Sequence, residues 1–395
     1  IIQNPEIAII YGDHDHIDSS GIFCDPHMKP DWNPDLFAAM NYLEPLVVCK
    51  KELWDSAKET VKDRYEVLSK ATNRVAPNKI FHIPHVLSTL QTTNDLNHLE
   101  PACNRVVYDL PEPMPPVSIL IPTRDQGEMI ERCLESLFER TNYKNFEVVL
   151  VDHETSEARA VKAIKKFKEK ENTKVVDFRG SFNFSSMMNL AAKKADGEVL
   201  VLLNNDTEII QPEWLTELVS QVSRNEVGIA GALLLFADGT IQHAGVHPGE
   251  GGLMGHGHKH LSGESYGYFS RLKAVHEVAA VTGACLCIEK NTWFDLGGLD
   301  EKNLSVAYND IDLCFKAREK GLRVIFTPYA KVIHHESVSR GPDNDPVINS
   351  RLSKELETMK NRWGEFIKID PAYNPNLRSD GGSFKLASEP KKIDF

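Results

Sequence analysis

The stretch Val199-Leu-Val-Leu-Leu-Asn-Asn-Asp206-Thr-Glu-Ile-Ile210 decides the fold class of this chain. It is an apolar run that ends abruptly in three polar residues, a pattern typical of a buried strand of a parallel sheet. Ligands of open α/β sheets bind outside the carboxyl ends of such strands. A carboxylate placed there is well positioned to hold a hard divalent cation, with the phosphates of a ligand completing the coordination shell. The stretch therefore predicts a metal-binding Asp206 that faces a phosphorylated substrate.

Strands and helices alternate on both sides of this stretch. Strands are expected at 117–122, 146–152 and 174–178. Helices are expected at 128–140, 157–171 and 185–195, and one more should open at Pro212-Glu213-Trp214. Such alternation predicts an α/β fold of Rossmann-like type, with a mostly parallel central sheet covered by helices on both faces.

The alternation loosens beyond about Gly228. Glycines and histidines gather at 242–260, where we expect a mobile loop. His256, His258 and His260 alternate along it and suggest a zinc site. The glycine and lysine between them give little rigidity, so a flexible loop on the acceptor side is the better interpretation. Regular structure should return with a strand near 279–288, a helix near 310–320 and a strand at 330–333.

A proline-dense linker at 109–116 divides the chain into two units. We expect the main domain to span 117–371 and a polar tail at 372–395 to lie on the surface or fray. Residues 1–108 have no counterpart of the opening strand and helix series. They begin with a strand at 7–11 and an acidic segment at 13–18, which we expect to be a polar surface turn. Because the chain begins at Ile1 without a methionine, we expect it to be part of a longer protein.

Composition excludes several classes of function. The chain has 395 residues, and 57 acidic against 45 basic side chains give a net charge of −12. This argues against a nucleic-acid partner and against a polybasic membrane patch. No apolar run approaches the length of a spanning helix. The seven cysteines lack the spacing of a disulfide framework, which favours a reducing, cytoplasmic compartment, and Cys285 and Cys287 are expected to be buried thiols.

Three groups could meet if the main domain folds as expected. Asp206 ends one strand, Asp310 starts a helix whose dipole favours a carboxylate, and His334 and His335 follow the strand at 330–333. Aspartate, histidine and phosphate oxygens form a sensible shell for Mn²⁺ or Mg²⁺. Asp310 could then act as the general base that deprotonates an acceptor hydroxyl.

The order of these segments resembles that of the family 2 inverting glycosyltransferases of GT-A fold, in particular the bacterial branch that builds O-antigen, capsule and rhamnose-containing polysaccharides. The segments that carry the resemblance are 117–122, 149–152, 202–206, 282–283, 309–312 and 334–337, together with phrases such as Gln242-His-Ala-Gly245 and Asn374-Pro-Asn-Leu377. The resemblance covers roughly residues 115–385. In the same terms, residues 1–108 look like the acceptor half of a preceding glycosyltransferase domain and are expected to be non-catalytic.

The resemblance implies a nucleotide-diphosphate sugar as the donor. Pro122 and Thr123 would border the nucleotide pocket, and Asp152 would contact the base. Asn205 would also face the donor, and Arg340 would help to neutralise its diphosphate.

The metal and the base follow from the same resemblance. Asp206 and His334 would bind Mn²⁺ or Mg²⁺, with His335 a weaker candidate, and Asp310 would be the catalytic base. Two acidic positions of the family motifs are asparagine in this chain: the Asp-x-Asp-like motif reads Asn204-Asn205-Asp206, and Asn309 replaces a glutamate. A single motif carboxylate implies a modest affinity for the metal.

The function implied is direct displacement of a nucleoside diphosphate by a hydroxyl of a growing bacterial surface glycan. The acceptor is expected to be lipid-linked, with the enzyme at the inner face of the cytoplasmic membrane in peripheral association. A nucleotidyltransferase is a weaker alternative, since the segment 123–127 offers only one Arg and one Gly to a phosphate loop. An inactive glycan-binding scaffold is the second alternative.

Simpler roles compete at each candidate residue. Asp206 and Asp152 could be turn residues, since Asp often ends a strand in this way. Asp310 could be only a helix cap while Asp312 serves as the base. His334 could be a core histidine.

Overall fold

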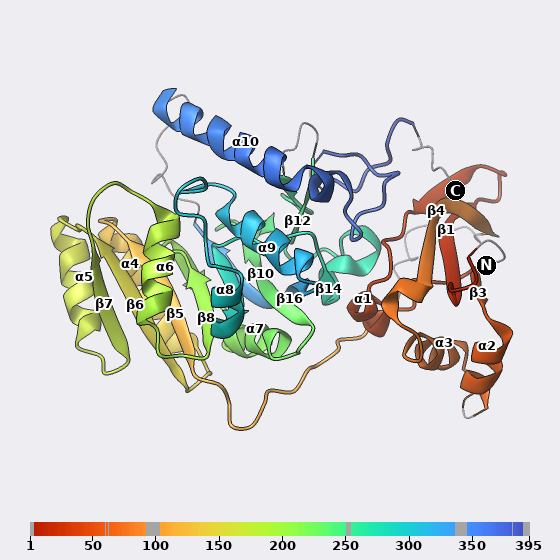
Figure 1. The fold of residues 1–395 in the computed structure, drawn as a ribbon, viewed down its shortest axis with the longest axis horizontal. Coiled ribbons are helices and arrows are strands. Elements are labelled where there is room, and N and C mark those ends of the chain that lie inside the picture. Colours follow the sequence, from red (N-terminus) through yellow and green to blue (C-terminus); the bar gives the residue numbers. More distant parts are fainter. Residues whose placement is uncertain are drawn as a thin grey trace.

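The computed structural model describes residues 4–59, 61, 63–91, 103–249, 254–335, 346–380 and 382–389. A small N-terminal unit lies beside a larger α/β domain, and an extended segment runs between them (Figure 1). Residues 103–116 contain neither helix nor strand. Within the described ranges, no helix combines the length and the apolar character needed to cross a bilayer.

Ten strands of the described residues form the sheet of the larger domain, with the order β14-β16-β10-β15-β8-β5-β6-β7, while β11 pairs with β10 and β9 with β16. The strands are β5 (Val117–Thr123), β6 (Phe146–His153), β7 (Thr173–Phe178), β8 (Val199–Leu203), β9 (Thr207–Ile209), β10 (Val227–Leu235), β11 (Ile241–His243), β14 (His276–Glu277), β15 (Cys285–Glu289) and β16 (Arg323–His334). The pairs β5–β6, β6–β7, β5–β8 and β10–β16 are parallel. The expected mostly parallel α/β sheet is confirmed.

Helices cover both faces of this sheet. One face packs against α4 (Gly127–Arg140), α5 (Ala158–Lys168) and α7 (Trp214–Val222). The other face packs against α6 (Phe184–Lys194), α8 (Lys290–Asp295), α9 (Asn309–Glu319) and α10 (Pro346–Lys368). Each helix buries an apolar stripe, and the strands between the two layers are apolar on both sides, as expected of a covered parallel sheet.

One central strand departs from the expectation that regular structure loosens beyond Gly228. Residues Val227–Leu235 form β10, and every residue of this strand is buried. Its first half is rich in glycine and alanine, which have low strand propensity, so the strand is hard to recognise from sequence. A Cβ at Gly231 would lie 2.4 Å from Cβ of Val281, so the close packing of this strand requires glycine.

The carboxyl ends of four strands meet at one edge of the sheet. β5 and β8 are parallel, β10 and β16 are parallel, and the antiparallel strand β15 lies between β8 and β10. The strands β5, β8, β10 and β16 therefore run in the same direction. This edge is where a doubly wound sheet places its ligand.

The N-terminal unit is a smaller mixed sheet built around β1 (Ile9–Ile17). β1 pairs antiparallel with β2 (Phe23–His27) and β3 (Val47–Cys49), and parallel with β4 (Ile80–Gln91). Its helices are α1 (Pro34–Ala39), α2 (Lys51–Lys58) and α3 (Arg64–Thr72), followed by the short 3₁₀ helix η1 (Pro77–Lys79). The expected surface turn at 13–18 is wrong for residues 13–17, which belong to β1. Asp13 is fully buried because β4 and the C-terminal segment cover it.

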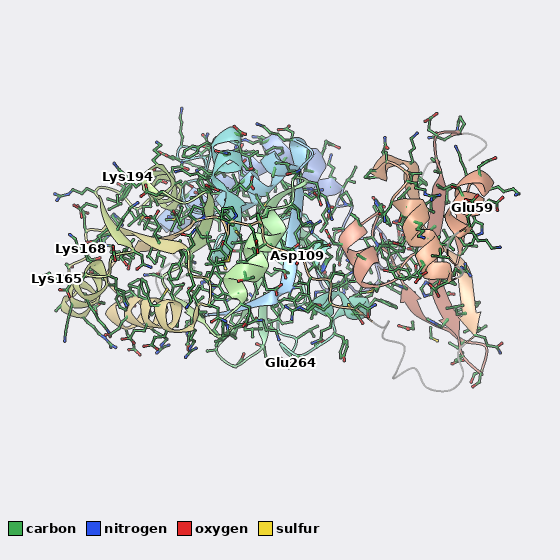
Figure 2. The ribbon with its side chains drawn as sticks, turned by 90° about the horizontal axis from the view of Figure 1, so that it is seen from below. Glu59, Asp109, Lys165, Lys168, Lys194 and Glu264 are labelled. Atoms are coloured by element: carbon green, nitrogen blue, oxygen red, sulfur yellow. The ribbon has the colours of Figure 1, made fainter. Side chains whose placement is uncertain are left out.

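Polar contacts join the two units. The buried Asp35 of α1 pairs with Arg323 of β16 and with Arg224, whose Nη2 lies 2.9 Å from Oδ1 of Asp35. Tyr108 donates a hydrogen bond of 2.5 Å to the same carboxylate. In Figure 2 the two units lie side by side, with the labelled Glu59 on the N-terminal unit and Lys165 and Lys168 at the opposite end of the larger domain.

The C-terminal segment does not behave as the expected surface tail. Tyr373, Leu377 and Phe384 are buried together with Met28 of the N-terminal unit. Asn374 is also buried, and its Nδ2 donates to Oδ2 of Asp13 at 2.9 Å and to the carbonyl of Lys29 at 2.8 Å. The segment fastens the two units together because its apolar and amide side chains find partners in both.

The glycine- and histidine-rich segment contains β11 and the hairpin of β12 (Val246–Pro248) and β13 (Met254–His256), so its described parts are regular rather than the expected mobile loop. The three histidines considered for zinc contact different groups. His256 approaches His243, with 2.8 Å between their Nδ1 atoms. His258 accepts a hydrogen bond from the backbone of Tyr268, and His260 stacks on Phe236.

All seven cysteines lie in the described residues, and all are free thiols. Cys285 and Cys287 are buried in β15, as expected from their alternation along an apolar run.

Candidate functional site

A cavity of about 490 Å³ opens at the carboxyl edge of the sheet. Its wall combines the end of β5, the turn after β8, the start of α9, the end of β16 and one residue of α10. Six of the residues given a role in binding or catalysis from the sequence line this cavity: Pro122, Thr123, Asn205, Asp206, Asp310 and His334. The structure thus brings together groups that are far apart in the sequence.

Strand pairing positions His334 beside Asp206. The turn after β8 leads into β9, which pairs antiparallel with the end of β16 so that Thr207 faces His334. The backbone N–H of His335 donates to the carbonyl of Asp206 at 2.9 Å. As a result, Nε2 of His334 lies 3.1 Å from Oδ1 of Asp206, and Asp206 is 5% exposed.

Gln242 of β11 orients the His334 ring. Its Nε2 donates to the backbone carbonyl of His334 at 3.3 Å, which turns the amide oxygen toward the ring. That oxygen lies 2.6 Å from Nδ1 of His334, so Nδ1 carries the proton and donates it. This pattern, with one ring nitrogen donating to an amide or carbonyl oxygen, is common in metal-binding histidines.

The pair Asp206 and His334 suits a divalent cation. Since Nδ1 donates its proton to Gln242, the ring can offer a metal the lone pair of Nε2, an atom that faces Oδ1 of Asp206 and lies 3.3 Å from Nδ2 of Asn204. A lone pair and a carboxylate oxygen repel each other at this distance unless a proton or a cation lies between them. Carboxylate and imidazole are ligands that Mn²⁺ accepts, and the cavity leaves room for phosphate oxygens.

His335 has a different partner. Its Nε2 lies 3.1 Å from Oε2 of Glu208 on β9. His334, and not His335, therefore lies on the cavity beside Asp206.

Asp310 lies in the first turn of α9, and the backbone N–H of Gly283 donates to its Oδ2 at 2.8 Å. This hydrogen bond and the helix N-terminus fix the carboxylate at the cavity wall. Asp312 is fully buried and contacts Arg362 at 2.6 Å and the indole N–H of Trp363 at 2.8 Å. Asp312 therefore joins α9 to α10, while Asp310 lies on the cavity. Asn309 is buried and donates to the carbonyl of Val306.

On the β5 side, the side-chain amide of Asn205 donates to the hydroxyl of Thr123 at 3.2 Å. Asp152 lies near the end of β6, and its Oδ1 accepts from the backbone N–H of Thr155 at 3.0 Å, so it supports a turn. The neighbouring His153 lines the cavity instead, with Nε2 2.8 Å from the carbonyl of Gly180.

Two arginines on the cavity wall were not assigned to the donor site from the sequence. Arg124 is exposed in the loop after β5, and Arg351 of α10 lies 3.6 Å from Glu355. From the sequence, Arg124 is considered only as the single arginine of a weak phosphate loop, although it directly follows a strand that ends at the expected ligand edge, whereas the place of Arg351 depends on helix packing. Arg340, proposed from the resemblance, lies outside the described residues.

The loop that carries Arg124 is fixed by its neighbour. Asp125 accepts hydrogen bonds from the backbone N–H groups of Glu157 and Ser156, and these bonds lower the pKa of its carboxyl group. At Gly127, a Cβ would lie 2.5 Å from the backbone nitrogen of Ala160, so glycine allows α4 to start against α5. The carboxylate of Asp125 thus binds the backbone just before α5, while Arg124 lines the cavity.

Comparisons with known proteins bear on the family of the chain. Residues 118–274 match the model of glycosyl transferase family 2, and residues 199–363 match that of glycosyl transferase family group 2. The chain is 37% identical to the uncharacterized protein y4gI of Sinorhizobium fredii, over 98% of this chain and 47% of that protein. It is 31% identical to the O-antigen biosynthesis protein RfbC of Myxococcus xanthus, over 99% of this chain and 33% of that protein.

The chain thus spans about half the length of the first relative and a third of the second. The solved structure of the mannosyltransferase PcManGT from Pyrobaculum calidifontis, in complex with GDP-Man and Mn²⁺, aligns at 16% identity with a TM-score of 0.47, over 67% of this chain and 72% of that one. The two family matches together span residues 118–363, and the larger domain of the chain belongs to glycosyltransferase family 2.

Proposed function

We propose that the chain is a metal-dependent inverting glycosyltransferase that moves a sugar from a nucleotide-diphosphate donor to a hydroxyl of a bacterial surface glycan. The observation that carries this proposal is the pair Asp206 and His334, held 3.1 Å apart on a cavity that Asp310 also lines. Family membership and the 31% identity to a protein named for O-antigen biosynthesis support the class of reaction and of acceptor.

Each side chain has a part in the proposed reaction. Asp206 and His334 would hold Mn²⁺ or Mg²⁺, which when bound neutralises charge on the departing diphosphate. Arg124 and Arg351 add positive charge on the same wall. Asp310, oriented by the N–H of Gly283, accepts the proton of the attacking acceptor hydroxyl. Pro122, Thr123 and Asn205 border the nucleotide.

Thermal unfolding with UDP, GDP, dTDP and CDP, each with and without Mn²⁺, tests donor binding. A ligand at 100 times its dissociation constant stabilises the native state by about 2.7 kcal/mol. We expect one nucleotide to raise the melting temperature only with metal, and Asp206→Ala to lose this shift. Asp196→Asn, at an exposed carboxylate paired with Lys174, is the matched control. No shift with any nucleotide at millimolar concentration would favour the scaffold interpretation.

The catalytic role of Asp310 needs a separate measurement. Asp310→Asn should keep the metal-dependent nucleotide shift and lower the rate of transfer by about 10²–10⁴, the usual contribution of a general base. The released product distinguishes a glycosyltransferase from the alternative, a nucleotidyltransferase. The first releases a nucleoside diphosphate, and the second releases pyrophosphate. Full activity of Asp310→Asn would assign the proton transfer to another group.

A further inference from the structure

A second cavity, of about 320 Å³, lies in the N-terminal unit. It is bordered by the far half of β1, the end of β2, the segment after α1 and the 3₁₀ helix η4 (Tyr268–Lys273) of the larger domain. The wall residues that matter here are His14, His16, His27, Asn41, Glu44 and Phe269. None of them belongs to the cavity that holds Asp206.

The wall of this cavity carries almost no net charge. Burial lowers the pKa of His14 to about 3, helped by Lys29 and His16, and burial lowers that of His27 well below its ordinary value. Both rings are neutral at physiological pH. The ammonium group of Lys29 donates to the backbone carbonyls of Gly12, Leu43 and Glu44, at 2.7, 2.9 and 2.8 Å.

Other polar side chains near the cavity also have partners. Nε of Arg64 lies 2.6 Å from Oε1 of Glu44. Nδ1 of His16 lies 3.6 Å from Oδ2 of Asp25. Among the described side chains that line the cavity, a phosphate would find no unpaired cation. Across the described residues, no three His, Cys, Asp or Glu side chains are arranged to hold a metal ion.

Three buried polar atoms on this wall make no hydrogen bond within the described part of the chain, and one of them, Oε1 of Glu44, is paired with Arg64. The other two lack a partner in that part of the chain. They are Nδ1 of His14, a residue that is 8% exposed, and Oδ1 of Asn41. Buried polar atoms without a hydrogen bond are rare in native proteins, and each calls for an explanation such as a water or a ligand. Both residues line the cavity, so a ligand with hydroxyl groups could satisfy both atoms.

The wall also offers an aromatic ring held in an unusual conformation. Phe269 stacks on His27 with 3.5 Å between ring centroids and an angle of 4° between the planes. Its backbone has φ of 46°, a left-handed conformation that bulky residues rarely adopt and that is often found at ligand sites. Neutral polar groups beside an aromatic ring suit a ligand with hydroxyls at its edge and an apolar C–H face.

We propose that this cavity binds a neutral sugar unit of a glycan chain. Such a ligand brings hydroxyl groups to His14 and Asn41 and needs no counter-ion. The binding itself is independent of the catalytic site. Its purpose, to hold a remote unit of the acceptor while another unit reacts, rests on the proposed transferase function.

Saturation-transfer NMR on the whole chain tests the proposal. The probes are the methyl glycosides of glucose, galactose, mannose, rhamnose and N-acetylglucosamine, each at millimolar concentration. At least one should receive saturation from the wild-type protein, and His14→Phe and Asn41→Leu should each weaken that signal at least fivefold. Asn41→Leu, at a half-buried position, serves as the second variant if His14→Phe does not fold.

Asp206→Ala is the matched control because it alters only the other cavity. Its glycoside signal should equal that of the wild type while its metal-dependent nucleotide shift is lost. No transfer to any glycoside, or a signal lost in Asp206→Ala and kept in both N-terminal variants, would overturn the proposal. Absent glycoside binding with an intact nucleotide shift would leave the transferase proposal standing. Glycoside binding without any nucleotide shift would contradict only the transferase.

Discussion

Asp13 of β1 and Asp206 after β8 are similar in local sequence and different in surroundings. Each follows an apolar run in the central part of a sheet, and each is at least nine-tenths buried. Asp13 contacts His82 at 2.9 Å, the backbone N–H of Lys29 at 2.8 Å and Asn374 at 2.9 Å. Asp206 contacts His334 at the wall of a cavity. A carboxylate with a full set of protein partners stabilises the fold, whereas one beside a cavity can bind a ligand.

Replacing Asp13 should give the largest effect on stability. Asp13→Ala removes a buried charge and takes from the ring of His82 and from Nδ2 of Asn374 one of the two hydrogen-bond partners that each has, which should lower the free energy of unfolding by about 3–5 kcal/mol. Urea denaturation followed by circular dichroism measures it. Metal-dependent nucleotide binding by the folded protein should not change.

Asp15 provides the matched control on the same strand. It accepts one hydrogen bond of 2.6 Å, from the exposed Thr89, so Asp15→Ala should cost about 1 kcal/mol or less. If Asp13→Ala kept full stability but abolished nucleotide binding, Asp13 would be the site residue and the contrast with Asp206 would be reversed.

The strands of the two sheets differ in how well the sequence predicts them. β5, β6 and β8 are recognisable because strands buried on both faces are continuous apolar runs. β10 is hidden by its glycines and alanines, and the strand residues 13–17 look like a loop because acidic residues and histidines alternate there. Propensity alone misplaces such strands, since tertiary contacts outweigh it.

The candidate site was predictable in part. The segments that carry Asp206, Asp310 and His334 stand at strand ends or helix starts, so a ligand edge could be expected for them. The choice between His334 and His335 depends on Glu208, and the choice between Asp310 and Asp312 depends on Arg362 and Trp363 in α10. These partners come from distant segments, and no local pattern specifies them.

The next prediction concerns the group that orients His334. Gln242→Leu removes the acceptor of the Nδ1 proton and should weaken Mn²⁺ binding by about 10–100-fold, the usual effect of losing such an outer partner. Gln242→Glu keeps an acceptor oxygen for Nδ1 but loses the donor to the His334 carbonyl, so it should weaken Mn²⁺ binding less than Gln242→Leu does. Mn²⁺ titration followed by electron paramagnetic resonance measures both, with His334→Ala as reference. Equal weakening in the two Gln242 variants would show that the hydrogen bond to Nδ1 is not what matters.

The pH dependence of stability should report on the pairing of His82 with Asp13. Burial alone would lower the pKa of His82, but hydrogen bonds and charges from Asp13 and Asp31 outweigh it and raise that pKa. The charged ring therefore stabilises the folded chain fully below the ordinary histidine pKa of about 6.5, and this contribution is lost as the pH rises through the raised value.

Urea denaturation between pH 5.5 and 9 measures this contribution as the difference in stability between the wild type and His82→Gln. The difference should be largest at the acid end and should shrink as the pH rises. The neutral, buried His14 and His27 respond in the opposite direction but are present in both proteins. A difference that grows with pH would mean that His82 is neutral between its two carboxylates.

The smallest effect on ligand binding is expected at Arg124, which lies on the cavity wall and not among buried partners as Asp13 does. Asp13 already has its protein partners, whereas Arg124 is exposed on the cavity wall, where its nearby charge is Asp125 and a diphosphate would bring a further one. Exposed ion pairs contribute up to about 1 kcal/mol, so Arg124→Ala should raise the dissociation constant of the nucleoside diphosphate by no more than about fivefold.

Arg132→Ala, at an arginine of α4 paired with Glu128, is the control and should leave that constant unchanged. Isothermal titration at two salt concentrations decides the matter, because a charge contact should weaken as salt rises. Identical constants for the two variants would remove Arg124 from the donor site and leave the positive charge of the cavity to Arg351.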